Sequence, residues 1–407
     1  MKCNDVKAKW HAYINGECTY DEEKAIESHI QQCSDCEKLL NKDLEDQEEE
    51  WLGKRNKLDN KKEKTINDLP QLKQRELIRK AKWKNRYSNV VTFVSLFIII
   101  SVISGIFTAG FYAIGGDRSI SQTATQVVRT TTQMTMPNIY IGSGGLNTNF
   151  YFNLDINYTI HQQVGRERQA IGELNGKMIL HRLNVNREWS DGQFDVKLHF
   201  LHPEYVENES DSEKEFFNNW LNKTWEALDY LPEGTVSEVA ITFDQLYELD
   251  EVYDILDGFD LDIPWYAIHT GTEHDGNDRG SPYLNATGGI WGLNENSIFD
   301  FSPTGGSVPS RGGGDVRAEA FKTGLQFLAD NERVVRQYKR HMSRDVSIQE
   351  RVDYVKEHGV KTYGVVITGP TKEILRLQES HQIIYATLGE VDFWNWNGSP
   401  ASGTIYN

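Results

Sequence analysis

Residues 90–114 read VVTFVSLFIIISVISGIFTAGFYAI, and this stretch divides the chain into two parts. No charged side chain stands between Tyr87 and Gly116. A helix needs roughly 20 apolar residues to cross the hydrocarbon core, because lipid offers no partner for free backbone groups. A buried core helix is the alternative, but helices of globular proteins are usually far shorter. The sequence therefore predicts a single transmembrane helix over residues 89–114.

The charges on either side of this stretch predict its orientation. Seven basic residues precede it, and Arg118 follows it beside Asp117. Because Lys and Arg stay on the cytoplasmic side, residues 1–88 are expected in the cytoplasm and those from 115 onward outside it. This arrangement describes a single-pass protein of the cell membrane, and the stretch lies too far from the N-terminus to be a cleaved signal peptide. The seven basic residues are Lys73, Arg75, Arg79, Lys80, Lys82, Lys84 and Arg86.

Charge and cysteine are distributed unevenly between the two parts. Residues 1–89 carry 19 Lys plus Arg and 18 Asp plus Glu, a net charge of +1, and the remainder carries a net charge of −18. A domain this acidic is not expected to bind nucleic acid directly. All four cysteines precede the apolar stretch, so the outer part folds without disulfides. Cysteines confined to the reducing side indicate metal binding.

The first 45 residues predict a small all-α module. Residues 4–15 are expected to form a first helix, and Gly16 is a suitable stop after it. The sequence TYDE at 19–22 fits a capping box that opens a second helix through about Gln31. The sequence SDCE at 34–37 fits another capping box and opens a third helix.

The motif that carries chemistry is Cys3 followed by His29-x-x-x-Cys33-x-x-Cys36. His29 and Cys33 are four residues apart, so a helix would project them from one face. Three thiolates and one imidazole fill a tetrahedral zinc shell and leave no open position for water, which predicts a structural site. Zinc would supply much of the folding energy of so small a module. Two alternatives stay open at this point, since Cys18 or His11 could replace Cys3 as a ligand, and oxidation could eject the metal.

The remaining chain predicts a linker, a stalk and an outer domain. Residues 46–88 are expected to form a polar and basic helical linker, and residues 115–147, rich in Ser, Thr and Gln, a stalk. Residues 148–407 predict an extracytoplasmic α/β (α+β) domain, because strand patterns alternate with helix patterns. Strands are expected at 150–160, 177–185, 194–201, 237–243, 263–268, 362–367 and 382–392. Helices are expected at 212–231, 249–256, 317–338, 346–358 and 371–379, with a Gly-rich loop at 270–314.

These residues carry two independent resemblances. The Cys3, His29, Cys33 and Cys36 pattern in a helical module ahead of one membrane span resembles the zinc-binding anti-sigma domain. LIRKAKWKNR at 77–86 and PNIYI at 137–141 look like the N-terminal segment of sigma-factor regulators. LPEGTVSEVAITF at 231–243, WYAIHTG at 265–271 and YGVVITG at 363–369 look like their C-terminal domain. The resemblance is to bacterial membrane anti-sigma factors, close to the anti-sigma-M type, and the 270–314 insert has no counterpart in it.

That resemblance implies a negative regulator of transcription. Such proteins bind an extracytoplasmic-function sigma factor and keep it from RNA polymerase. In this chain the outer domain is expected to control release, through a membrane protein co-regulator or through proteolysis. A helical bundle with an amphipathic extension can occupy the helical surface of such a partner. About half of the candidate contacts are expected simply to pack the bundle, and the basic residues before the span are expected to touch anionic membrane lipid. The candidate partner contacts are Trp10, Tyr13, Leu40, Leu44, Trp51 and Leu52.

Two other functions compete with this one. An extracytoplasmic enzyme could use His269, His274, Asp275 and Asp278, which lie in or beside a loop. No nucleophile motif or phosphate loop accompanies them, so a solvated acidic loop is the simpler interpretation and no enzyme is expected. A membrane receptor whose zinc module binds another cytoplasmic protein is the third hypothesis.

Overall fold

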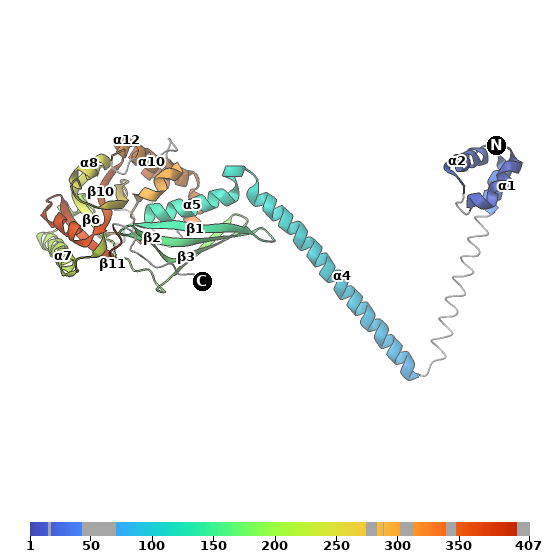
Figure 1. Cartoon of the computed structure of the whole chain (residues 1–407), viewed down its shortest axis with the longest axis horizontal. Coiled ribbons are helices and arrows are strands. Elements are labelled where there is room, and N and C mark those ends of the chain that lie inside the picture. The colour runs from blue at the N-terminus through green and yellow to red at the C-terminus, as the bar shows by residue number, and fades with distance from the viewer. Residues whose placement is uncertain are drawn as a thin grey trace. The chain divides into compact units, whose positions relative to one another are not determined.

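The computed structural model describes residues 1–14, 18–42, 71–273, 283–287, 289–301, 312–338 and 347–396. These form two compact units, residues 1–97 and 98–407 (Figure 1). The predicted fold class is confirmed: a small helical module precedes one long apolar helix and a sheet-rich α/β region.

The N-terminal module consists of three short helices. α1 spans Cys3–Ile14, α2 spans Tyr20–Ile30, and residues 34–42 are helical. The capping box predicted for α2 is present, with the Thr19 backbone N–H donating to the Glu22 carboxylate at 3.1 Å. The buried core is small and contains Val6, Ile26, Ile30 and Cys36. The Gly16 stop lies outside the described residues.

The apolar stretch forms one continuous helix. α4 spans Gln71–Ala113, and its portion Arg79–Ala113 is long and apolar enough to cross a membrane by length and composition. Among the described residues it is the single helix that meets this test. The most apolar window has a mean hydropathy of 2.7, and none of it is buried inside the protein. Residues 71–88 of the predicted linker therefore belong to the same helix.

The segment after this helix is not the stalk that the sequence predicted for 115–147. A 3-10 turn, η1 (Gly116–Arg118), leads into α5 (Ile120–Thr135), and β1 (Ile139–Thr148) follows directly. α5 lies along β1, and its residues Ala124 and Val128 join the core of the first sheet while Val127 and Met134 join that of the second (Figure 1). The prediction of a stalk was wrong because a Thr-rich helix can be buried when its hydroxyls bond to its own backbone. The Thr132 hydroxyl donates to the Val128 carbonyl oxygen at 2.8 Å, and that of Thr135 to the Thr131 carbonyl oxygen at 2.7 Å.

The first sheet of the outer domain is an antiparallel meander in the order β1-β2-β3-β4. It comprises β1, β2 (Asn153–Val164), β3 (Glu167–Ile179) and β4 (Arg182–Trp189). The single strand predicted at 177–185 is in fact a hairpin, which turns at Leu180 with a positive φ of 55°. The pattern of apolar residues continues across this turn, so the periodicity of the sequence did not indicate that the strand ends there.

The second sheet has the order β11-β6-β10-β7-β9, and all neighbouring strands are antiparallel. Side chains alternate between its faces. Val239, Ile241 and Phe243 pack in one cluster, and Ala240 packs in another with Phe200. The first cluster includes residues of the helices α8 (Leu249–Ile255), α10 (Gly314–Asp330) and α12 (Ile348–His358). The strands are β6 (Thr235–Glu248), β7 (Asp262–His269), β9 (Gly292–Asn294), β10 (Lys361–Pro370) and β11 (Ile383–Phe393).

Most of the remaining elements are of the predicted type, helix or strand, but several differ from the predicted length. The predicted strand at 194–201 is reduced to β5 (Phe200–Leu201), which pairs with β8 (Tyr283–Leu284). The predicted helix at 317–338 is two helices. The helices are α6 (Pro203–Glu207), α7 (Asp211–Tyr230), α8 (Leu249–Ile255), α9 (Ile298–Phe301), α10 (Gly314–Asp330), α11 (Glu332–Tyr338), α12 (Ile348–His358) and α13 (Thr371–Leu375), with 3-10 turns η2 (Glu295–Ser297) and η3 (Arg376–Glu379).

Candidate metal centre

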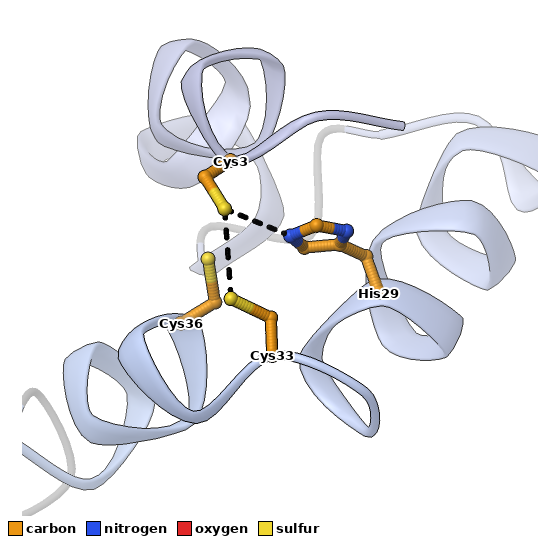
Figure 2. Close-up of side chains that lie close together, drawn as sticks. All are labelled: Cys3, His29, Cys33 and Cys36. Atoms are coloured by element: carbon orange, nitrogen blue, oxygen red, sulfur yellow. Dashed lines mark hydrogen bonds between the residues drawn. The ribbon is translucent and has the colours of Figure 1, made fainter.

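Four predicted ligands converge at the junction of the three N-terminal helices. Cys3 begins α1, and His29 occupies the last turn of α2. A tight turn then places Cys33 and Cys36, because the Cys36 backbone N–H donates to the Cys33 carbonyl oxygen at 3.1 Å. Figure 2 shows the side chains of all four residues pointing toward one another.

The spacing of the ligand atoms suits a tetrahedral ion. Cys3 Sγ lies 3.4 Å from His29 Nε2 and 3.5 Å from Cys33 Sγ (Figure 2). All four ligand atoms lie within 4.8 Å of one another. Tetrahedral zinc with Zn–S bonds near 2.3 Å separates two sulfurs by about 3.8 Å. Small adjustments of these side chains would therefore complete a zinc shell.

The local backbone makes the thiols at 33 and 36 unequal. Backbone N–H groups of Cys36 and Asp35 point at the Cys33 sulfur and lower the pKa of that thiol, with a further contribution from Cys3. Burial raises the pKa of the Cys36 thiol to about 11, and the neighbouring Cys33 adds to this rise. Cys33 therefore loses its proton more readily than Cys36, and both would bind a metal ion as thiolates.

The two alternative ligands lie outside this group. Cys18 is half-buried against the same small core, and His11 is exposed on α1. Neither belongs to the group of four converging ligand atoms in the described part of the chain. Geometry therefore favours Cys3 over both.

The candidate partner contacts fall into two sets. Trp10, Tyr13 and Leu40 are half-buried and pack against the core of the module, and the rings of Trp10 and Tyr13 lie 5.9 Å apart. Each of these three side chains thus has a packing role and retains an exposed portion. The other three, Leu44, Trp51 and Leu52, lie outside the described residues.

In the outer domain, His269 belongs to a buried polar network. Its Nδ1 lies 2.9 Å from His202 Nε2 and 3.0 Å from Glu273 Oε2, and its Nε2 lies 2.8 Å from the Tyr354 hydroxyl. Burial opposes ionisation of Glu273, but hydrogen bonding to His269 and the charge of Arg351 lower its pKa to about 2. Such a paired, hydrogen-bonded carboxylate can stabilise the end of β7 without any catalytic role.

Sequence reasoning found one member of this network, His269, and missed the other four, among them Tyr354. His202, Glu273 and Arg351 come from separate segments, and the sequence signal that could have linked two of them was the His269–Glu273 spacing of four residues. His202 and His269 also form, with the exposed Glu204, a group whose ligand atoms lie within 4.8 Å of one another. The other proposed enzyme residues, His274, Asp275 and Asp278, lie outside the described residues.

Three family models match the chain. The model described as "Putative zinc-finger" matches residues 3–36, and its two ends coincide with Cys3 and Cys36. The model described as "Sigma factor regulator N-terminal" matches residues 75–169, and "Sigma factor regulator C-terminal" matches residues 228–390. The matches thus cover the helical module, the apolar helix with the first strands, and most of the second sheet.

A curated relative has the same extent. The chain is 25% identical over 404 residues to the "Probable anti-sigma-M factor YhdL" of Bacillus subtilis (strain 168), a match that covers 97% of this chain and all of the relative. No solved structure matches significantly. Proteins of this kind are regulatory rather than catalytic. With its zinc-finger module, its apolar helix and both regulator domains, the chain belongs to the sigma factor regulator family of anti-sigma factors.

Proposed function

We propose that this chain holds an extracytoplasmic-function sigma factor at the cytoplasmic face of the membrane, and that its outer domain controls release. The observation that carries the proposal is the convergence of Cys3, His29, Cys33 and Cys36 in a module that precedes the two regulator domains. The relative's name as a probable anti-sigma-M factor supports the same class of partner.

The metal in this proposal is Zn²⁺, and its role is structural. Three sulfurs and one imidazole nitrogen match the donor set that zinc prefers, and they occupy all four tetrahedral positions. The ion would hold α1, α2 and the helical residues 34–42 in one arrangement. The surface presented to the sigma factor would then depend on the metal without the metal touching it.

The exposed edge of the module is the proposed contact surface. Trp10, Tyr13 and Leu40 keep part of their side chains outside the core, and aromatic residues are common anchors of protein interfaces. Leu44, Trp51 and Leu52 continue this apolar series in a very polar segment, where a partner is the best explanation for them.

The proposed orientation places the helical module in the cytoplasm and residues 115–407 outside it. The basic residues before the span and the scarcity of basic residues after it support this direction. Labelling of intact cells or spheroplasts with a membrane-impermeant amine reagent tests it. Lys223 and Lys361 should react in intact spheroplasts, whereas Lys2 and Lys7 should react after lysis alone.

A pull-down tests the function itself. The tagged full-length chain would be purified from its host in mild detergent, as wild type, as Cys33→Ser/Cys36→Ser and as Cys18→Ser. Cys18 is the matched control because it lies in the same small core outside the ligand group. Wild type and Cys18→Ser should retain a sigma factor, and the double variant should lose it.

Each other outcome rejects a defined part of the proposal. Retention of the same sigma factor by the double variant would show that the metal group does not shape the binding surface. Absence of sigma factor from every sample, together with enrichment of another cytoplasmic protein, would favour the receptor hypothesis. Expression of the target genes in each strain provides an independent readout, since loss of sequestration should raise it.

A further inference from the structure

Residues 101–112 of α4 belong to the same compact unit as the outer domain and contact it through one stripe. Positions 101, 104, 105, 108 and 112 recur at helical spacing, so their side chains share a face of the helix. Two tips of the first sheet lie on this stripe, the loop 149–152 before β2 and the turn 179–181 between β3 and β4. We name them the first tip and the second tip.

Hydroxyl groups of the helix satisfy the backbone of the first tip. The Tyr151 backbone N–H donates to Ser104 Oγ at 2.8 Å, and the Phe152 N–H donates to Thr108 Oγ1 at 2.9 Å. The hydroxyls of Ser101 and Tyr151 are hydrogen-bonded at 2.7 Å. Ser and Thr hydroxyls of this apolar helix therefore form hydrogen bonds with backbone N–H groups for which lipid offers no partner.

The buried Tyr112 connects the helix to both tips. Its hydroxyl lies 2.8 Å from the Phe152 carbonyl oxygen and 3.2 Å from the carbonyl oxygens of Met178 and Leu180. The Leu180 N–H donates to the Phe152 carbonyl oxygen at 3.0 Å, so the two tips are also bonded to each other. Both tips and the helix thus form one hydrogen-bonded unit.

The outward surface of the first tip is apolar and uncharged, and that of the second tip is apolar at Ile179 and Leu180, between the exposed Lys177 and Arg182. Residues 141–154 carry no charged side chain. Phe150, Tyr151, Ile179 and Leu180 are 46–51% exposed, and they stand beside helix residues that are themselves exposed and apolar, such as Ile106 at 70%. Tyr151, Phe152 and Leu180 also adopt positive φ values of 55–59°, a strained conformation for such residues. Exposure of this apolar surface to water is unfavourable, whereas contact with lipid acyl chains is not.

We propose that the two tips lie within the membrane leaflet nearer the outer domain, packed on the transmembrane helix and in contact with lipid acyl chains. This inference rests on the proposed membrane span of α4. A rise of 1.5 Å per residue places Ser101 about 18 Å along the helix from Ala113, so the tips reach well into the apolar segment. The occupant of the apolar surface is lipid because that surface continues the lipid-facing surface of the helix.

The consequence is a hydrogen-bonded connection between the outer domain and residues 101–112 of α4. The family model of the N-terminal regulator region extends over residues 75–169 and so includes the stripe and the first tip in one matched segment. With no stalk between them, a displacement of the first sheet would carry residues 101–112 with it. A signal read by the outer domain could then reach the cytoplasmic side as movement of the helix.

Lipid photolabelling of the full-length chain tests the proposal. The wild-type protein would be placed in phosphatidylcholine–phosphatidylglycerol vesicles that contain a lipid with a diazirine on its acyl chain, and labelled peptides would be mapped by mass spectrometry. Peptides that cover residues 98–113, the first tip and the second tip should all be labelled. Phe393 and Tyr230, which are 84% and 87% exposed, serve as apolar controls that should remain unlabelled.

The pattern of labels distinguishes failure of the inference from failure of the span. Labelling of the helix without either tip would overturn the inference and leave the membrane span intact. Labelling of neither the helix nor the tips would reject the span on which the inference rests. Equal labelling of the tips and Phe393 would show nonspecific reaction of exposed aromatic residues, and would also overturn the inference.

A pair of glycine variants tests the contact with the helix. A Cβ at Gly105 would lie 3.1 Å from two ring carbons of Phe150, whereas a Cβ at Gly110 meets nothing within 4 Å. Gly105→Leu should therefore displace the first tip and raise hydrogen exchange at the Tyr151 and Phe152 amides by about tenfold, as expected for loss of a hydrogen bond. Gly110→Leu, in the same helix, should leave this exchange unchanged. Equal exchange in the two variants would contradict docking of the tip on the helix.

Discussion

Removal of zinc from the N-terminal module is expected to unfold α1 and α2. Among the described residues of this module, the fully buried aliphatic side chains are Val6, Ile26 and Ile30. Burial of each contributes about 1.5–3 kcal/mol, so these side chains supply at most about 9 kcal/mol. A structural zinc ion contributes about 10–16 kcal/mol to a small domain near neutral pH. The metal would therefore exceed these three side chains together as a source of stability, and the module should not remain folded without it.

Hydrogen exchange with mass spectrometry measures this effect in the full-length chain in detergent. After a chelator has removed the metal, backbone amides of residues 3–14 and 20–30 should lose their protection. Amides of β6 and β10 should keep theirs, because the outer domain has a separate and much larger core. Metal analysis of the same samples establishes that the ion has left.

Single substitutions provide the matched comparison for chelation. Cys36→Ser should reproduce the loss of protection, since Cys36 is both a candidate ligand and fully buried. Cys18→Ser should keep protection and metal content close to wild type. The reasoning is refuted if α1 and α2 stay protected in a chain that has lost its metal, because the apolar side chains alone would then suffice to fold the module.

Three further outcomes are expected. Zinc affinity, measured by competition with a chelating dye, should fall as the pH is lowered, because the Cys36 thiol has a pKa of about 11 and must lose its proton to bind. Arg351→Met should lower the free energy of unfolding of the outer domain by about 3–5 kcal/mol in urea, because it removes a permanent positive charge from beside the buried Glu273. Arg376→Met, on an exposed pair, should change it by less than about 0.5 kcal/mol. Because the pKa of Glu273 is about 2 against an ordinary 4.5, its ionised form stabilises the fold above pH 4.5, and this stability should be lost as the pH falls from 4.5 through 2. Glu273→Gln should weaken that dependence in urea titrations across the same pH range.

Local patterns were sufficient to predict several elements. The capping box at Thr19 placed the start of α2, and helical or alternating patterns placed α7, α8, β6, β7 and β10 within a few residues. These patterns succeed because each element has one buried side and a recognisable end. The His29, Cys33 and Cys36 spacing likewise predicted three of the four converging residues, because they lie close together in sequence, at the end of α2 and in the turn and helix that follow it.

Local patterns failed where distant segments determine the environment of a residue. The choice of Cys3 over Cys18 depends on how α1 lies against α2, a long-range contact that spacing does not encode. The same holds for His202 and Arg351, which reach His269 and Glu273 from elsewhere in the fold.

Two features could be predicted from the sequence without the structure. The cysteine motif predicted a small zinc-binding module, and the apolar stretch at 90–114 predicted one membrane-compatible helix. Length and hydrophobicity are properties of the stretch alone, so no tertiary contact was needed to identify it. Tertiary structure alone decided the environment of the segment after this helix. The Thr-rich segment 120–135 looks solvent-exposed in sequence, yet α5 is buried between two sheets. Its Ala124, Val127, Val128 and Met134 side chains join the two cores, and the hydroxyls of Thr132 and Thr135 bond to the helix backbone. Hydroxyl groups also pair backbone groups where Ser104 and Thr108 accept hydrogen bonds from the backbone N–H groups of the first tip. Because of these contacts, the domain is attached directly to residues 101–112 of the helix, without the expected stalk.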